Sequence, residues 1–266
     1  RSGFRDFGPL GKYDPDFVVR ALPSIHDDHF GGQPDLLVWD DTGGQPAWTR
    51  WLFALRNLGF VEGLDYDLYV TRGASSGVGN GLGGRATSAQ LAGYQTLVYT
   101  SGDLRRFLLG HGDFATDPSN DLAVLQNWFA QGDKNALFAG DNLASDLLEA
   151  GAAGASFLHQ YLAVNVLSND VSPLIGLQVS PGVVTIPGTG VIVRAEEWTA
   201  YGGCPDLATF DCVTAVGSGQ RLAEYTDWNG DPGYYPYAAA TYNHVGSEHA
   251  DIVYLPHDLS SIRNPS

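Results

Sequence analysis

Apolar positions in residues 94–148 alternate between strand-like and helix-like segments. Residues 95–103 begin with β-favouring side chains and end in a Ser-Gly-Asp turn, which is typical of a buried strand that ends in a loop. Residues 121–131 place large apolar side chains at helical spacing, and residues 135–140 form a second short apolar run, followed by another helical pattern. Two strands joined by a helix of this length are expected to be parallel, with a right-handed crossover.

The same patterns predict the rest of an α/β unit. Strands are also predicted at residues 35–40, 65–71 and 250–255. Helices are also predicted at residues 46–58, 87–94, 152–164 and 256–262. The sequence therefore favours an α/β fold with a mainly parallel sheet.

Two segments depart from this pattern. Residues 1–33 are rich in Gly, Pro and Asp without periodicity, so we expect an extended N-terminal arm or a linker. Residues 166–249 contain short β runs separated by Gly and Pro, which predicts a β-rich insertion or subdomain before the last core strand. The α/β core would then comprise residues 34–165 and 250–266.

The sequence of residues 94–148, in which YQTLVYTSGDL is followed by LAVLQNWFAQGDKNALFAGDNLASDLL, resembles class I glutamine amidotransferase-like domains. It is most similar to the ThuA-like branch that occurs inside large secreted bacterial proteins. The resemblance covers residues 34–165 and 251–262. It implies a flavodoxin-like three-layer sandwich, in which the strand at residues 135–140 leads into a nucleophile elbow.

Residues 140–144 (GDNLA) occupy the place of that elbow. Catalytic members of such families carry Cys within G-x-C-x-G, and a late His-x-Glu motif completes a triad. Here Asn142 stands at the nucleophile position. His257 lies roughly where the family's His is expected, but Leu259 replaces the Glu two residues later. The resemblance thus implies a degenerate elbow without glutaminase chemistry.

Two interpretations of the elbow remain. In the favoured one, Asp141 or Asn142 caps the N-terminus of the following helix, where a side-chain oxygen accepts backbone N–H bonds. In the alternative, Asp141, His257 and Asp103 act together as a hydrolase at the C-terminal ends of the strands, where open α/β sheets bind their ligands.

The charge balance narrows the range of partners. The net charge is -16, and Lys12 and Lys134 are the only lysines, so nucleic acid and anionic membranes are poor partners. No apolar run approaches the roughly 20 residues that a membrane-spanning helix needs. We therefore expect no membrane span.

Cysteine and methionine usage points to export. The chain contains no Met, even at position 1, which favours a processed product whose signal peptide has been removed. Cys204 and Cys212 lie close together in a Gly-, Pro- and Asp-rich stretch, which favours a local disulfide in an oxidising compartment. Two free thiols are the alternative. We expect a secreted or cell-surface protein.

Near the end of the β-rich segment, three oxygen-bearing residues have the spacing of ligands in a calcium-binding loop. Asp227, Asn229 and Asp231 alternate like the first oxygen ligands of a calcium loop, but Pro232 stands where an EF-hand needs Gly. An ordinary Asx-turn cluster is favoured over a calcium site. The neighbouring aromatic side chains either pack against their own domain or form an exposed platform for sugar rings or another subunit.

The leading hypothesis is a secreted or cell-surface structural or interaction module with a degenerate active site. Its partner would be another extracellular protein, a second copy or a glycan, and no cofactor is required, calcium being an optional ligand. The alternative is a secreted hydrolase that uses Asp141 and His257.

Overall fold

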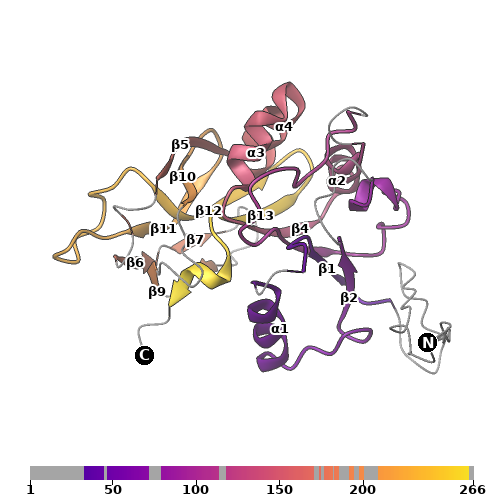
Figure 1. Cartoon of the computed structure of the whole chain (residues 1–266), viewed down its shortest axis with the longest axis horizontal. Helices are drawn as coiled ribbons and strands as arrows, with labels where there is room; N and C mark the ends of the chain where they lie inside the picture. Colours follow the sequence, from indigo (N-terminus) through magenta and orange to yellow (C-terminus); the bar gives the residue numbers. More distant parts are fainter. Residues whose placement is uncertain are drawn as a thin grey trace, which may run out of the picture.

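The computed structural model describes residues 33–44, 47–71, 79–113, 118–170, 174, 177–181, 183–185, 192–194, 198–200 and 209–263. Five parallel strands form the centre of the molecule (Figure 1). They are β1 (Leu36–Asp40), β2 (Tyr66–Val70), β3 (Thr96–Thr100), β4 (Asn135–Ala139) and β13 (Ala250–Leu255). Their order β2-β1-β3-β4-β13 is that of flavodoxin-like folds, so the predicted fold class is confirmed.

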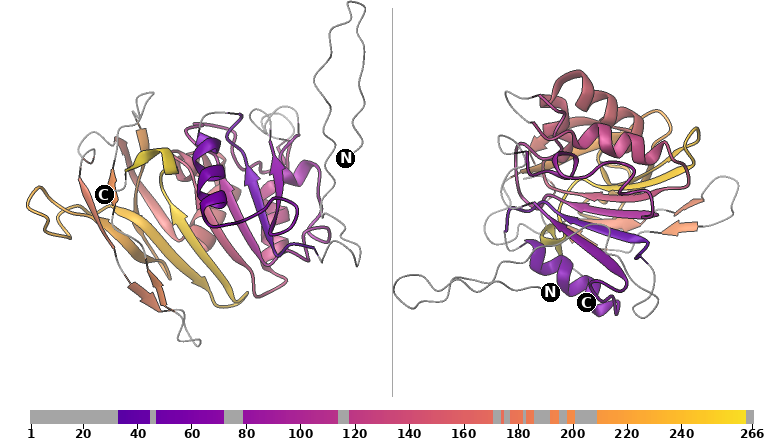
Figure 2. Two further views of the ribbon diagram at one scale, coloured as in Figure 1. Left: turned by 90° about the horizontal axis from the view of Figure 1, so that it is seen from below. Right: turned by 90° about the vertical axis from the view of Figure 1, so that its right-hand side faces the viewer.

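Helices cover both faces of this sheet (Figure 2). α1 (Ala47–Asn57) lies on one face. α2 (Asp121–Phe129), α3 (Leu143–Glu149) and α4 (Gly151–Phe157) lie on the other, and α4 continues as a π-helical turn, η2 (Leu158–Leu162). The arrangement gives the three layers expected of this fold.

The alternation of side chains along β1 explains why its apolar run is continuous. Leu37 and Trp39 enter the core beneath α2, α3 and α4, whereas Val38 packs on the opposite face with Leu55 of α1. β3 divides its residues between the two faces in the same way. Successive strand residues point to opposite faces, so a strand covered on both sides needs apolar residues throughout.

The predicted β-rich segment is present and extends the same sheet. β12 (Ala238–Val245) pairs antiparallel with β13, and β11 (Gln220–Tyr225) pairs with β12. Beyond β11 the sheet continues with β6 (Gln178–Pro181), β9 (Trp198–Ala200) and β14 (Ile262–Arg263). β10 (Thr209–Ala215) pairs with β12 outside this order, and β5 (Val164–Asp170) pairs with β10. β7 (Val183–Thr185) and β8 (Ile192–Arg194) form a separate hairpin.

Two predicted helices are replaced by tighter structure. Residues 87–94 form turns that follow a 3-10 turn, η1 (Leu82–Gly84). The predicted closing helix is only a 3-10 turn, η3 (Leu259–Ser261), because the chain then pairs as β14 with β9. At the closing segment, pairing with a strand distant in sequence therefore overrides the local helical pattern.

Two predictions fall largely outside the described residues. The N-terminal arm, residues 1–33, is described only at Gln33, and Cys204 of the predicted disulfide is not described. Cys212 lies buried in β10. The pairing of the two cysteines thus remains a prediction.

Candidate functional site

The C-terminal ends of the parallel strands bring the predicted site residues to one edge of the sheet. Asp103 follows β3, Asp141 and Asn142 follow β4, and His257 follows β13. The strand ends are joined by backbone hydrogen bonds, such as those from Ser101 N to Ala139 O and from Asp141 N to Gly102 O. Parallel pairing in register thus assembles the edge from three separate parts of the chain.

Asp141 is buried and connects the elbow to the last loop. Its Oδ1 accepts hydrogen bonds from the backbone N–H of Asp258 at 2.8 Å and from the hydroxyl of Ser261 at 3.3 Å. Only 1% of the residue is exposed. Burial raises the pKa of Asp141 well above its ordinary value, and the nearby charges of Asp258 and Asp103 act in the same direction.

The N-terminus of α3 is capped by a residue that the sequence analysis did not single out. Oδ2 of Asp211, from β10, accepts hydrogen bonds from the backbone N–H groups of Ala144 at 2.7 Å and Ser145 at 3.2 Å. The other oxygen accepts the hydroxyl of Ser145, and the hydroxyl of Tyr254 also donates to Oδ2. Burial raises the pKa of Asp211 to about 6.

The expectation that Asp141 or Asn142 caps α3 is therefore wrong. Asn142 holds the capping position along the chain, but its side chain makes no capping hydrogen bond. Asp211 lies 67 residues beyond Ala144. Nothing in the local sequence of the elbow indicates such a distant cap, because it depends on β10 lying beside α3.

His257 and Asp258 are also enclosed. Burial lowers the pKa of His257 to about 4, so its imidazole is neutral, and its ring lies 5.8 Å from that of Phe210. Asp258 Oδ2 accepts hydrogen bonds from the indole of Trp51 at 2.9 Å and the hydroxyl of Thr100 at 2.8 Å. The last loop is thereby fixed to both α1 and β3.

Of the proposed hydrolase residues, Asp141 and His257 are thus brought to the same buried loop junction. Asp141 bonds to the backbone of the residue that follows His257. Asp103 lies at the same edge but is exposed.

Two further buried carboxyl groups lie at the end of β1. Asp40 Oδ1 accepts hydrogen bonds from the N–H and hydroxyl of Thr42, and Asp41 Oδ2 accepts the hydroxyl of Tyr99 at 2.8 Å. Burial raises the pKa of both groups. The sequence places two aspartates at this strand end, but it does not indicate that both side chains are enclosed.

Several polar atoms at this edge are enclosed without a partner. Within the described part of the chain, Oδ2 of Asp141, Oδ1 of Asp41 and Oγ of Ser101 are buried and make no hydrogen bond. Buried carboxylates without donors are costly when charged, which agrees with the raised pKa values of the two aspartates. The carboxyl groups of Asp41 and Asp141 can therefore carry protons, but both are enclosed.

The calcium-like segment forms an Asx turn. Oδ1 of Asp227 accepts hydrogen bonds from the backbone N–H groups of Asn229 and Asp231, both at 2.8 Å. The Asn229 amide donates to Oδ2. The N–H of Asp231 and the other turn donors lower the pKa of Asp227. Across the described residues, no group of three or more His, Cys, Asp or Glu side chains is placed to hold a metal ion.

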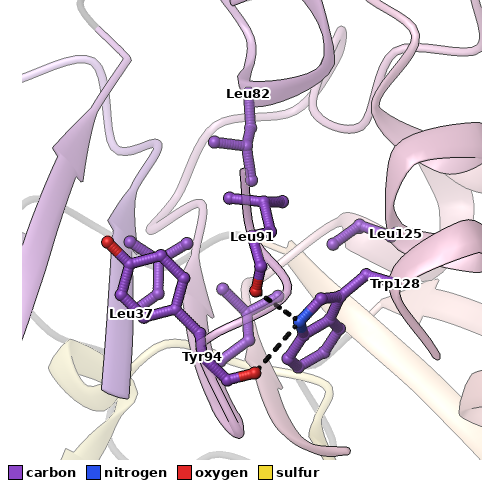
Figure 3. Close-up of a pocket in the computed structure, with 7 residues that line it drawn as sticks. Leu37, Leu82, Leu91, Tyr94, Leu125 and Trp128 are labelled. Carbon is purple, nitrogen blue, oxygen red and sulfur yellow. Dashed lines mark hydrogen bonds between the residues drawn. The ribbon is translucent and has the colours of Figure 1, made fainter. Parts of the chain in front are cut away.

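An apolar cavity lies beneath α2, away from the elbow. Its volume is about 10 Å³, and Trp128 Nε1 donates to the carbonyls of Leu91 and Tyr94 at its wall (Figure 3). It is lined by Leu37, Leu82, Leu91, Tyr94, Leu97, Leu125 and Trp128. A cavity this small barely holds one water, and its apolar walls offer that water few partners. It is a packing gap rather than a ligand site.

Comparison with models of known protein families and with curated proteins gives no match for this sequence. In the part of the chain that the structure describes, none of the helices has the length and apolar character required to cross a membrane.

Proposed function

We propose that this chain is a non-catalytic structural or interaction module of a secreted or cell-surface protein, built on a degenerate amidotransferase-like elbow. The occupation of the α3 N-terminus by Asp211 carries the proposal. In a working elbow, the N–H groups at the start of this helix lower the pKa of the nucleophile or hold a developing oxyanion. Here the Ala144 and Ser145 N–H groups already bind a carboxylate of the same chain.

The negative charge of the Asp211 carboxylate would also repel the negative charge that a catalytic reaction develops at the elbow. An anion at the elbow would lie near the charge of Asp211 instead of facing free N–H donors. Like charges disfavour each other strongly where water is excluded. Two features from different parts of the chain therefore favour a non-catalytic role. Asn142, which follows β4, stands at the nucleophile position, and Asp211, on β10, occupies the N-terminus of α3.

The enclosure of the elbow further supports a non-catalytic role. Asp141 and His257 are 1% and 2% exposed, and the Asp141 carboxyl is engaged with the loop that contains η3. Raised and lowered pKa values are common at catalytic sites. In both residues, however, burial is the main cause of the shift, and a hydrolase would need these groups to reach a substrate.

The resemblance and the extracellular location form part of the proposal. The strand order agrees with the fold that the resemblance implies. The proposed location rests on the spacing of Cys204 and Cys212.

The test measures turnover of ester, amide and glycoside substrates by the parent protein and by Asp141→Asn and His257→Gln. We expect no turnover above the buffer rate in any of them. Turnover by the parent that disappears in either variant, without a lower melting temperature, would overturn the proposal and favour the hydrolase. Asn142→Ala is the matched control, since it alters the elbow without touching either proposed catalytic group.

A further inference from the structure

The connection between β11 and β12, residues 226–237, extends away from the body of the sheet on the side opposite α2 (Figure 1). Two of its aromatic side chains are among the most exposed large apolar groups described: Trp228 is 76% exposed and Tyr234 is 71% exposed. Isolated exposed aromatics carry little meaning by themselves. The turn that holds Trp228 and the residues that flank both rings give further evidence about what they could bind.

The turn that presents Trp228 is held in one conformation. Around it, Asp227 N donates to Asp231 O at 2.9 Å, Gly230 N donates to Asp227 O at 3.0 Å, and the carboxylate of Asp227 accepts from Asn229 and Asp231. An isolated bridge between Thr226 and Pro232 closes the base of the turn. The backbone around Trp228 is therefore ordered before any ligand binds, which reduces the entropy cost of binding.

The other aromatics of the connection anchor it. Tyr235 and Tyr237 are partly buried against the core beneath β11 and β12, with stacked rings 6.4 Å apart. Tyr234 meets Tyr235 edge to face at 4.9 Å. Of the aromatic residues predicted either to pack or to form a platform, the inner ones pack inward while Trp228 and Tyr234 face solvent.

The chemistry beside the exposed rings selects among ligand classes. Residues 226–237 contain no Lys, Arg or His, and the nearby Arg221 is engaged by Glu224 and the Pro236 carbonyl. Anionic ligands would find no cation here. Asp227 is occupied by its own turn, so a metal would have to displace backbone donors.

A protein partner also fits the connection poorly. The cores of protein interfaces are contiguous and depleted of charge. Here Asp, Asn and Gly residues separate Trp228 from Tyr234 along the chain. Aromatic faces interspersed with carboxylate and amide groups instead match a pyranose, which offers C–H bonds on its faces and hydroxyl groups around its edge.

We propose that Trp228 and Tyr234 form a binding site for a neutral polysaccharide. The exposed carboxylate of Asp231 lies between them in the chain, as does the exposed amide of Asn229, which also donates to Asp227, and both can bond to sugar hydroxyls. The inference names the partner of the interaction module, and so it rests on the proposed function.

The experiment is affinity electrophoresis of the full chain in gels that contain hydroxyethyl cellulose, galactomannan or glycol chitin. We expect at least one of these polymers to retard the parent, and Trp228→Ala and Tyr234→Ala to weaken the retardation up to about tenfold, as loss of an aromatic contact does. Phe53→Ala is the matched control, because Phe53 is also exposed, at 58%, but belongs to α1. It should migrate like the parent.

If the parent migrates in all three gels as it does in a gel without polymer, the inference is overturned. Equal retardation of the parent and of both Trp228→Ala and Tyr234→Ala would also overturn it. Melting temperatures verify that each variant is folded, and Tyr234→Ala provides a second test if Trp228→Ala is unstable. Sedimentation of a parent dimer that becomes a monomer in Trp228→Ala would also overturn it, in favour of self-association. Release of reducing ends in the same samples would contradict the proposed non-catalytic function without affecting binding.

Discussion

At the residue scale, Asp141 and Asp211 are both buried carboxyl groups, but their surroundings differ. Asp211 accepts bonds from two backbone N–H groups and two hydroxyls, whereas Oδ2 of Asp141 is buried without a donor among the described residues. Donors stabilise the charged form, and their absence favours the protonated form. Asp211 is therefore suited to act as an anionic cap, and Asp141 as a neutral link.

The first prediction separates the observed cap from the one expected from sequence. Asp211→Ala should lower the free energy of unfolding by about 1–3 kcal/mol, because it leaves the N–H groups at the start of α3 without their acceptor. Asn142→Ala should have a much smaller effect, since that side chain makes no capping bond. Urea unfolding of both variants at neutral pH measures the difference. Equal losses in the two variants would contradict the assignment of the cap to Asp211.

The second prediction concerns the protonation of Asp141. Its pKa is raised in the folded state, so the folded state binds the proton more tightly, and stability falls as the pH rises above the ordinary value toward the raised one. Asp141→Asn keeps an acceptor for Asp258 N–H and removes this fall, so its stability relative to the parent should increase with pH. Asp141→Ala should instead lose about 1–3 kcal/mol, because the Asp258 N–H is then unsatisfied. Unfolding curves between pH 4 and 8 measure both effects, and a parent-to-Asn difference that does not change with pH would contradict the raised pKa.

At the scale of elements, the elbow depends on how closely β4 approaches β3. A Cβ added to Gly140 would lie 2.0 Å from Ser101 Oγ and 3.3 Å from Ser101 Cβ. The glycine is thus required by packing between neighbouring strand ends. Any larger residue would push β4 and α3 away from the buried loop.

The third prediction follows from this contact. Gly140→Ala should lower the free energy of unfolding by about 1–3 kcal/mol, the usual range for overpacking. Replacing Ser101 with Gly removes both opposing atoms, so the double variant Gly140→Ala/Ser101→Gly should recover part of that loss. A double-mutant cycle by chemical unfolding measures the coupling. Additive losses would mean that the contact is relieved by another route.

At the scale of the whole molecule, the dominant property is negative charge. The chain carries a net charge of -16 and has a sequence pI of about 4.5. The ion pair between Arg106 and Glu149 is largely exposed, and such pairs contribute little. Self-repulsion among the acidic groups therefore opposes the compact state at neutral pH.

The fourth prediction is that salt stabilises the protein. Raising sodium chloride from about 0.05 to 0.5 M at pH 7 shortens the screening length and should raise Tm by roughly 2–4 °C, the shift that about 1 kcal/mol produces in a chain of this size. The control is the same titration near pH 4.5, where the net charge vanishes and the increase should be much smaller. Calorimetry measures both. Equal increases at the two pH values would point to a general salting-out effect instead of relief of repulsion.

Local patterns in the sequence are enough to predict the parallel core and the place of the elbow. Strands such as β1 and β3 contain consecutive apolar residues because both of their faces are covered, and α1 carries its buried residues at helical spacing. These are local signals, since each depends on residues that are neighbours in the chain. They also located the turn that holds Asp141 and Asn142, because a strand run ends there and a helical pattern begins.

The residues that surround that turn depend on contacts that form only in the folded chain. Within the predicted β-rich segment, β12 has a weak strand signal of its own, because Ala238–Ala240 is a weak strand former, yet it lies between β11 and β13 in the sheet. In place of the predicted closing helix, the chain forms a 3-10 turn and then β14, which pairs with β9. The cap of α3 comes from Asp211, on a strand that pairs with β12 of the sheet and with β5. Each of these contacts joins segments far apart in the chain, where burial and pairing outweigh the preferences of neighbouring residues.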